Sequence, residues 1–404
     1  MEKVFIVSCA RTPIGKFGGS LKSVSAAKLG AIAMEEAVQR IGNREIIEQI
    51  NEVIMGNVLQ AGVGQAPARQ AALFAGLPDK VKTITIRKEC ASSLAAIDFA
   101  HSRIKAGEAQ IIIAGGMESM SQSPYLLRRY FIEGEKNFGH RDGNMLFAEK
   151  QLMDSMLWDG LQDVYEDTHP HMGELVEAVA KRYKVSRYDQ DLFAILSFER
   201  ANRAMRDGNF EKEIAPVRKL LSKDEGIRET SVRKLFSLKP VFIEAGTITA
   251  GNASQLSDGA AALVLMSEDY AQELDIQPMA RVVACAGYAL APAKFPLAPI
   301  GAIKEVLGKA NLSVSDIDFF EINEAFAPVP IIASRELKIP MDRLNVRGGA
   351  IALGHPLAAS GARILTTLLY ILQDHQAQYG IVSACNGGGE AVAVLIENLQ
   401  RPVS

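Results

Sequence analysis

The feature that most constrains the fold of this chain is an internal repeat of strand, helix and strand. An apolar run at 4–15 (VFIVSCARTPIG) is followed by a helix-like stretch at 27–40 and a second apolar run, and the same order begins again at 282–290 (VVACAGYAL). Strands that alternate with helices of about 10–15 residues indicate parallel βαβ units. We therefore expect an α/β protein built from two related halves, at 1–120 and 276–404.

A second correspondence strengthens this interpretation. Cys90 precedes a helix-like segment (LAAIDFAHSRI), a strand and a Gly-Gly turn, and His355 precedes a similar segment (GARILTTLLYIL), a strand and three glycines. The middle of the chain is more polar and helical. We interpret 121–250 as an inserted loop domain that covers the substrate, with 251–275 returning to the first half.

Composition excludes several classes of protein. The 44 basic and 47 acidic residues give a net charge of −3, which argues against a nucleic-acid-binding protein. Four cysteines in 404 residues cannot form a disulfide framework, so a reducing compartment is expected. We see no targeting segment and no apolar run near the roughly 20 residues of a membrane helix. The sequence therefore predicts a cytoplasmic protein without a membrane or nucleic-acid partner.

The cysteines fall into two pairs. Cys9 and Cys285 occupy equivalent positions in the first strand of each half, where a small core side chain is the simpler interpretation. Cys90 and Cys385 lie near strand ends beside turn-forming residues, where open α/β sheets bind ligands.

Cys90 is expected at a helix N-terminus, because Ser92 and Ser93 follow it and serines are good N-caps. The helix dipole there should lower the pKa of the thiol, which suits a nucleophile that forms a thioester. An inert buried thiol is the alternative.

Three further loops carry candidate groups. His355 lies in a glycine-lined turn (GGAIALGHP) and could act as a general base, whereas His101 falls on an apolar helix face and is expected in the core. Cys385 precedes three glycines whose N–H groups could bind an oxyanion. Asn323 follows a strand and could hold a carbonyl oxygen, or merely stabilise a turn. No Cys or His pair has metal-ligand spacing, so we expect no metal.

These loops resemble the signature motifs of thiolases. The similar segments are CASS at 90–93, NEAFA at 323–327, GGAIALGHPLAASGAR at 348–363 and CNGGG at 385–389. Further segments at 106–121, 171–173 and 246–267 are also similar, so the resemblance extends over nearly the whole chain. The resemblance implies the thiolase fold: two duplicated βαβαβαββ halves in a five-layered αβαβα arrangement with an inserted loop domain.

The resemblance also implies roles for individual residues. Cys90 would carry the acyl group, His355 would activate Cys90 and the thiol of coenzyme A, and Cys385 would exchange a proton with the α-carbon of acetyl-CoA. Asn323 and His355 would bind the thioester oxygen, and the N–H groups of Cys90 and Gly387 would hold the tetrahedral oxyanion. Contacts with coenzyme A or the acyl group would come from His171, Met172, Arg228, Ser254, Phe295 and Phe326.

Within the family, PAKFPLAP at 292–299 resembles the acetoacetyl-CoA enzymes. That implies reversible acyl transfer to coenzyme A, which is a substrate here and not a cofactor, in a homo-oligomer (a dimer or tetramer). Some relatives of that branch are activated by potassium, but the tyrosine expected near Ile227 is missing, so we expect no ion. The segment 125–150 is longer than usual near the tetramer contacts of thiolases.

Three departures from the family motifs concern the shape of the site. Ser93 and Ala358 stand where the family has glycine, and Glu390 follows the triple glycine. Alternative functions are a thiolase for medium or long chains and a catalytically silent, lipid-binding thiolase-like protein. Ketoacyl synthases and hydroxymethylglutaryl-CoA synthase are disfavoured, because they lack a second catalytic cysteine in a CxGGG-type loop.

Overall fold

The computed structural model describes residues 2–127 and 152–400, and within these ranges ten strands form one sheet. Its order is β10-β11-β12-β9-β1-β8-β5-β3-β4, with β2 paired to β8. The N-terminal strands are β1 (Val4–Arg11), β2 (Gly15–Lys16), β3 (Glu52–Gly56), β4 (Lys82–Ile86), β5 (Ile111–Ser119) and β8 (Ser257–Ser267). The C-terminal strands are β9 (Ala280–Ala289), β10 (Phe319–Ile322), β11 (Tyr379–Asn386) and β12 (Glu390–Asn398).

The pairing of the strands confirms the duplication. In the N-terminal half β3 runs parallel to β5, and β8 lies antiparallel between β5 and β1. In the C-terminal half β10 runs parallel to β11, and β12 lies antiparallel between β11 and β9. An antiparallel contact of β1 with β9 joins the halves, at Val4–Ile6 and Ala280–Val282. Each half therefore repeats one topology.

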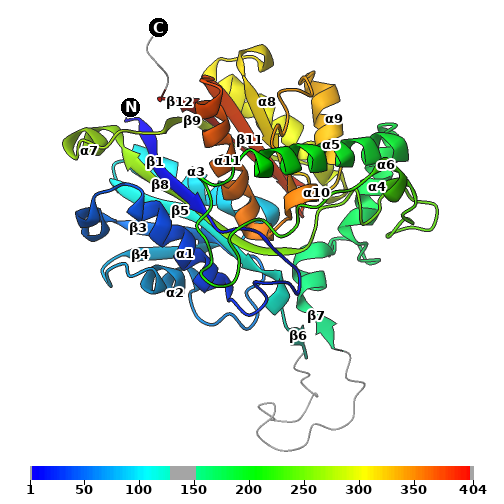
Figure 1. Cartoon of the computed structure of the whole chain (residues 1–404), viewed down its shortest axis with the longest axis horizontal. Coiled ribbons are helices and arrows are strands. Elements are labelled where there is room, and N and C mark those ends of the chain that lie inside the picture. Colours follow the sequence, from blue (N-terminus) through cyan, green and yellow to red (C-terminus); the bar gives the residue numbers. More distant parts are fainter. Residues whose placement is uncertain (1, 128–151, 401–404) are drawn as a thin grey trace, which may run out of the picture.

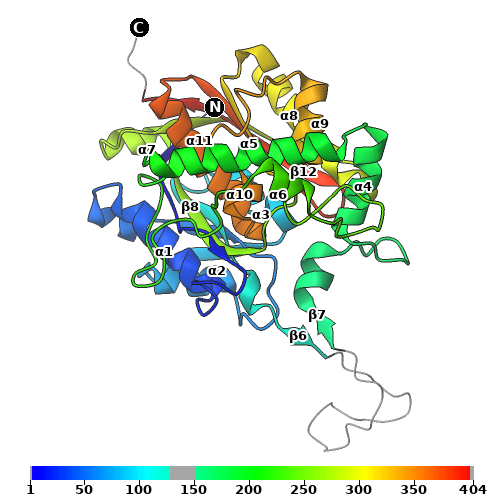
Figure 2. The same ribbon diagram turned by 45° about the vertical axis from the view of Figure 1, so that its right-hand side comes forward.

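The N-terminal and C-terminal strands of this one sheet form two layers with helices outside and between them, so helices and strands alternate in five layers (Figures 1 and 2). Helices α1 (Ala26–Gln39) and α2 (Pro67–Phe74) cover the outer face of the N-terminal half, and α8 (Ala298–Ala310) and α9 (Pro328–Leu337) cover that of the C-terminal half. Between them lie α3 (Ser92–Lys105) and α11 (Ser360–Asp374), whose core cluster includes residues of both halves. The five-layered α/β fold expected from the resemblance is confirmed.

The central helices reflect this position in their sequences. Residues of α11 from Ser360 to Leu372 are all buried, because the helix is packed between two layers of strands and has no solvent face. Helix α1, on the outside, keeps polar residues on its exposed face and begins at Ser25, whose hydroxyl accepts a hydrogen bond from Lys28 N. The position before α11 is therefore followed by a helix that is buried along nearly its whole length.

The segment between β5 and β8 forms the inserted region. Its elements are β6 (Tyr125–Leu126), β7 (Met153–Asp154), a π-helical turn at Leu157–Leu161, α4 (Met172–Arg182), α5 (Arg187–Arg206) and α6 (Val232–Phe236). Figure 2 shows α5 lying across the front of the molecule. Ser186 and Asp189 start α5 with a capping box. The long segment at 125–150 lies almost entirely outside the described residues.

Short helices complete the described chain: η1 (Arg44–Gln49), η2 (Glu89–Ala91), η3 (Met120–Gln122), α7 (Glu268–Glu273), η6 (Pro292–Leu297), η7 (Val314–Asp316), α10 (Ala350–Leu353) and η8 (Leu357–Ala359). In the part of the chain that the structure describes, no helix combines the length and apolar character needed to cross a membrane.

Candidate active site

Cys90 lies in η2, immediately before α3, and faces His355 across the two halves. Its Sγ is 3.1 Å from His355 Nε2. The turn is fixed by Ser92, whose hydroxyl accepts from Lys88 N at 2.8 Å and donates to Glu89 O at 2.6 Å. Glu89 adopts a φ of 42°, in the left-handed region. A tight, strained turn therefore presents the thiol to the histidine.

A hydrogen bond on the far side of the ring sets the tautomer of His355. Its Nδ1 is 2.5 Å from Ser360 Oγ, and the Ser360 hydroxyl donates to Pro356 O at 3.1 Å. Because a hydroxyl has one proton to donate, Ser360 accepts from Nδ1–H. His355 Nε2 is then left with a lone pair that faces the Cys90 thiol, as a general base requires.

Burial keeps both groups neutral. It lowers the pKa of His355 to about 3, assisted by the positive charge of Arg363. Burial also raises the pKa of Cys90, and the neighbouring Cys385 adds to this effect. Our prediction of a lowered pKa for Cys90 is wrong: the N–H group of its turn acts in that direction, but desolvation outweighs it. The resting pair is a thiol and a neutral imidazole.

Cys385 and Gly387 lie at the end of β11, which packs against η2. Cys385 is buried, and burial raises the pKa of its thiol to about 12. The following hairpin needs glycine at Gly388 and Gly389, where φ is 92° and 90°. A Cβ placed on Gly387 would lie 3.6 Å from Glu89 Cγ, which places this residue beside the turn that carries Cys90.

Asn323 follows β10 and lies beside His355. Its backbone N–H donates to Ser383 O at 2.9 Å, and its Nδ2 is 3.4 Å from His355 Nε2. Its Oδ1 is buried and has no hydrogen-bond partner among the described residues. Because β10 and β11 are parallel, Asn323 and Cys385 emerge at the same edge of the sheet.

The predicted substrate residues of the loop domain reach the same region. His171 caps α4 by accepting from Gly173 N at 3.0 Å, and its ring stacks on Phe242 with centroids 4.5 Å apart. Phe242 in turn contacts Phe326, edge to face, at 5.9 Å. Ser254 N donates to Ala325 O at 3.0 Å. This chain of rings links the loop domain to the NEAFA loop.

Two other predicted residues lie deeper in the fold. Phe295 is 2% exposed and belongs to the same core cluster as Met172 and Phe326. The segment that carries Phe295, η6, packs against α4. Phe295 therefore lies in the core beneath the loop domain. Met172 lies against the glycine hairpin, because its Cε is 3.8 Å from a Cβ placed on Gly387.

Arg228 lies apart from these groups, on the loop domain. Its guanidinium is 4.9 Å from the Phe198 ring centroid and donates to Gln255 Oε1 at 3.1 Å. A cavity of about 370 Å³ adjoins it and contains both acidic and basic side chains. The cavity is lined by Ile195, Phe198, Glu199, Asn202, Arg203, Arg206, Glu229 and Thr230.

Sequence reasoning missed Ser360 and Glu118. Glu118 is fully buried and accepts four hydrogen bonds from the loops around Cys90 and His355. The donors are Asn57 Nδ2, Val58 N, Leu59 N and Ala358 N, at 2.9–3.1 Å. Glu118 lies within the segment 106–121 that resembles thiolases, but only the folded chain brings its donors together. Ser360 was visible five residues after His355.

The departures from the family motifs are accommodated. Ser93 Oγ accepts the N–H of Ala362 at 2.8 Å and so satisfies the start of α11. Ala358 is buried and gives its N–H to Glu118. Glu390 forms an ion pair with Lys88, which joins the glycine hairpin to the turn of Cys90.

Comparison with known proteins agrees with the fold. Models of the thiolase N-terminal and C-terminal domains match residues 4–269 and 276–398. Proteins named "Probable acetyl-CoA acyltransferase" from Staphylococcus aureus strains COL and N315 are 45% identical over 405 residues, covering 98% of this chain and 99% of theirs. The crystal structure of Acat5 thiolase from Ascaris suum in complex with coenzyme A has a TM-score of 0.89 at 40% identity, covering 98% of this chain and 100% of that one. The chain belongs to the thiolase family.

Proposed function

We propose that this protein transfers acyl groups to and from coenzyme A, cleaving acetoacetyl-CoA to two acetyl-CoA or condensing two acetyl-CoA. The observation that carries the proposal is the 3.1 Å contact of Cys90 Sγ with His355 Nε2, with Cys385 and Asn323 at the same edge of the sheet. The acyltransferase names of the relatives and the coenzyme A bound to the Ascaris thiolase support it.

In the first step the Cys90 thiol gives its proton to His355 Nε2 as Sγ attacks the thioester carbon. The resting pair is neutral, so charge separates only as the reaction proceeds. The tetrahedral oxyanion accepts hydrogen bonds from the N–H groups of Cys90 and Gly387, and one such donor contributes roughly 3 kcal/mol. When the intermediate collapses, the leaving thiolate takes the proton from His355 and acyl-Cys90 remains.

In the second step of synthesis the Cys385 thiol gives its proton to His355 Nε2, and the resulting Cys385 thiolate removes a proton from the α-carbon of acetyl-CoA. The raised pKa of Cys385 makes its thiolate a strong base, which suits the weak acidity of such a carbon. His355, now protonated at Nε2, donates a hydrogen bond to the enolate oxygen, and Asn323 acts through a water that its unpartnered Oδ1 accepts from and that donates a second hydrogen bond to the enolate. The carbanion then attacks acyl-Cys90, and the Cys90 thiolate leaves and takes the proton from His355 Nε2, which restores the neutral pair.

Coenzyme A lies along the loop domain in this proposal. Ser254 and His171 contact the pantetheine arm, and Arg228 contacts the adenine end near the cavity of about 370 Å³. The acyl group sits among Met172, Phe295 and Phe326. Arg228 is already supported by the Phe198 ring, so its guanidinium is preorganised for a ligand.

The proposed preference for short chains rests on the buried Phe295 and on the apolar packing around Cys90. Cys90 packs against a small cluster of Val58, Leu59, Met120, Leu357 and Ala358. We expect kcat/KM for thiolysis to be greater with acetoacetyl-CoA than with 3-ketooctanoyl-CoA. The reverse order would favour a thiolase for medium or long chains.

The direct test is to mix the enzyme with acetyl-CoA, quench with acid and map the peptides by mass spectrometry. We expect an acetyl group on Cys90 that is absent in Cys90→Ala and retained in Cys9→Ala, a matched change of a buried cysteine outside the site. An adduct elsewhere would contradict the mechanism, and no adduct with any acyl-CoA would indicate a silent lipid-binding member.

We further propose that the reaction uses no resident cofactor, because thiol, imidazole and amide groups supply every proton transfer and hydrogen bond that it needs. Potassium is not expected to affect it, since the tyrosine expected near Ile227 is missing. We propose a cytoplasmic homo-oligomer, a dimer or tetramer, that acts in fatty acid metabolism. Mass photometry and a potassium titration of activity test these points.

A further inference from the structure

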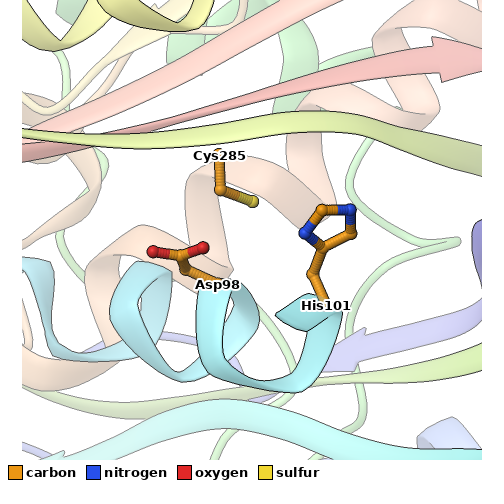
Figure 3. A group of neighbouring side chains, drawn as sticks. All are labelled: Asp98, His101 and Cys285. Carbon is orange, nitrogen blue, oxygen red and sulfur yellow. The ribbon is translucent and has the colours of Figure 1, made fainter. Parts of the chain in front are cut away.

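A second cluster of chemically capable side chains lies in the central layer, away from Cys90. Asp98 and His101 of α3 face Cys285 of β9, as Figure 3 shows. One ligand atom from each, a carboxylate oxygen, an imidazole nitrogen and Sγ, lies within 4.8 Å of the other two. His101 and Cys285 are buried, and Asp98 is half-buried. The group therefore converges on one point in the interior.

The local structure explains why these side chains meet. Asp98 and His101 are three residues apart on α3, so they project from the same face of the helix. That face packs against β9, where Cys285 points toward the helix. No metal-ligand spacing is visible in the sequence, because the third residue comes from the other half of the protein. The expected roles of His101 and Cys285 as simple core residues describe their burial but not this juxtaposition.

We propose that Asp98, His101 and Cys285 bind one zinc-like divalent cation, which links α3 to β9. The donor set of one sulfur, one nitrogen and one oxygen matches the ligands that zinc takes in proteins. On binding, the Cys285 thiol releases its proton to solvent and its sulfur bonds to the metal, with a water in the fourth position. Burial lowers the pKa of His101 to about 4, so the imidazole lone pair is available at neutral pH.

Two lysines oppose the cation. Lys309 donates to Cys285 O at 2.7 Å, and Lys105 lies one turn after His101 on α3. The carboxylate and the thiolate together carry two negative charges and balance the ion, so the lysines weaken the site without excluding it. Lys309→Met should therefore bind the cation more tightly than the unaltered protein.

The duplication supplies an internal control. Cys9 holds the equivalent place in β1, where its Sγ lies 4.0 Å from Met279 Sδ and its partners on α11 are the hydroxyls of Thr366 and Tyr370. Neither is a ligand that zinc prefers over carboxylate, imidazole or thiolate. Of the two equivalent cysteines, only Cys285 faces both a carboxylate and an imidazole. Cys9 therefore serves as a core cysteine without the metal-binding arrangement.

The test uses full-length protein in which Cys90 and Cys385 are both serine, so that the active site offers no thiolate to a metal. Titration with Co²⁺ should give a sulfur-to-cobalt charge-transfer band that saturates at about one ion per chain, because a bound thiolate is deprotonated. Cys285→Ser should abolish the band and Cys9→Ser should leave it unchanged. A band that persists in Cys285→Ser, or disappears in Cys9→Ser, would overturn the proposal.

Two further variants guard against a folding defect in Cys285→Ser. Asp98→Asn and His101→Leu should each weaken cobalt binding, with thermal unfolding in EDTA used to confirm that the proteins are folded. Zinc should raise the melting temperature of the protein in which only Cys90 and Cys385 are serine (the background protein), because a ligand that binds only the native state stabilises it. Zinc should not raise the melting temperature of either variant. Equal cobalt affinity in both variants and the background would refute the site.

Discussion

Ser360→Ala should slow acylation of Cys90 because it removes the acceptor that orients His355. The hydroxyl lies 2.5 Å from His355 Nδ1 and both residues are buried. Its loss leaves a buried N–H without a partner, at a cost of about 1–3 kcal/mol. The cost increases when the ring becomes cationic in the transition state, since charged donors make stronger hydrogen bonds. Only this increase slows the reaction, because the neutral cost is already present in the ground state. Charged hydrogen bonds exceed neutral ones by about 1–1.5 kcal/mol, so at about 1.4 kcal/mol per tenfold the rate should fall roughly five- to twelvefold.

Stopped-flow measurement of Cys90 acetylation tests this magnitude, with steady-state thiolysis of acetoacetyl-CoA as a second assay. We expect kcat to fall while KM changes little, because Ser360 lies behind the imidazole ring. Ser383→Ala is the matched control: its hydroxyl is equally buried but donates to Val392 O at 3.0 Å. Acetylation of Ser360→Ala within about twofold of that control would refute the assigned tautomer.

Three other predictions address separate parts of the molecule. Cys385→Ala should still form acetyl-Cys90 but fail to condense, and loss of both steps would show that its role is assigned wrongly. Burial lowers the pKa of His101 from 6.5 to about 4, so the unfolded chain binds more protons between these values and stability should fall as pH drops through them. Urea titrations in EDTA measure how the free energy of unfolding changes with pH, and His101→Leu should reduce this slope by up to about 1.4 kcal/mol per pH unit. An unchanged slope would argue against the lowered pKa of His101. Gly389→Ala should destabilise by at least about 1–3 kcal/mol, because φ is 90° and its Cβ would meet Leu290 O at 2.4 Å, whereas Gly387→Ala should stay within about 0.5 kcal/mol. Equal melting temperatures for the two glycine variants would contradict this.

The sequence was most informative where local pattern and topology agree. The apolar runs at 4–15 and 282–290 became β1 and β9, and the helix-like stretch at 27–40 is α1. Strand β8 was not predicted, because its sequence, SDGAAALVLMS, is a nearly continuous run of apolar residues that is rich in alanine. Such a run has no alternation, since both faces of β8 are buried. Period alone cannot separate it from a buried helix.

The positions of the candidate catalytic residues followed from the same topology. Parallel strands end at one edge, so loops after such strands were expected to converge, and Asn323 and Cys385 do so. Their electrostatics could not be predicted in this way. The sign of the Cys90 shift depends on desolvation by both halves, against which one helix terminus is the smaller effect. The same holds for Glu118, whose donors come from two loops that are distant in sequence.

Duplication explains why the proposed nucleophile and base oppose each other. Helices α3 and α11 are equivalent in the two halves and meet near their N-termini, where a Cβ on Gly361 would lie 2.5 Å from Leu94 Cγ. Ser93 Oγ accepts a hydrogen bond from Ala362 N, so one copy supports the other at this contact. The residues that precede the two helices are therefore brought together by the symmetry of the fold. Divergence of the two halves needed only to place a thiol before one helix and an imidazole before the other. The halves also diverged within these helices: Asp98 and His101 of α3 lie beside Cys285, whereas the residues of α11 beside Cys9 are Thr366 and Tyr370.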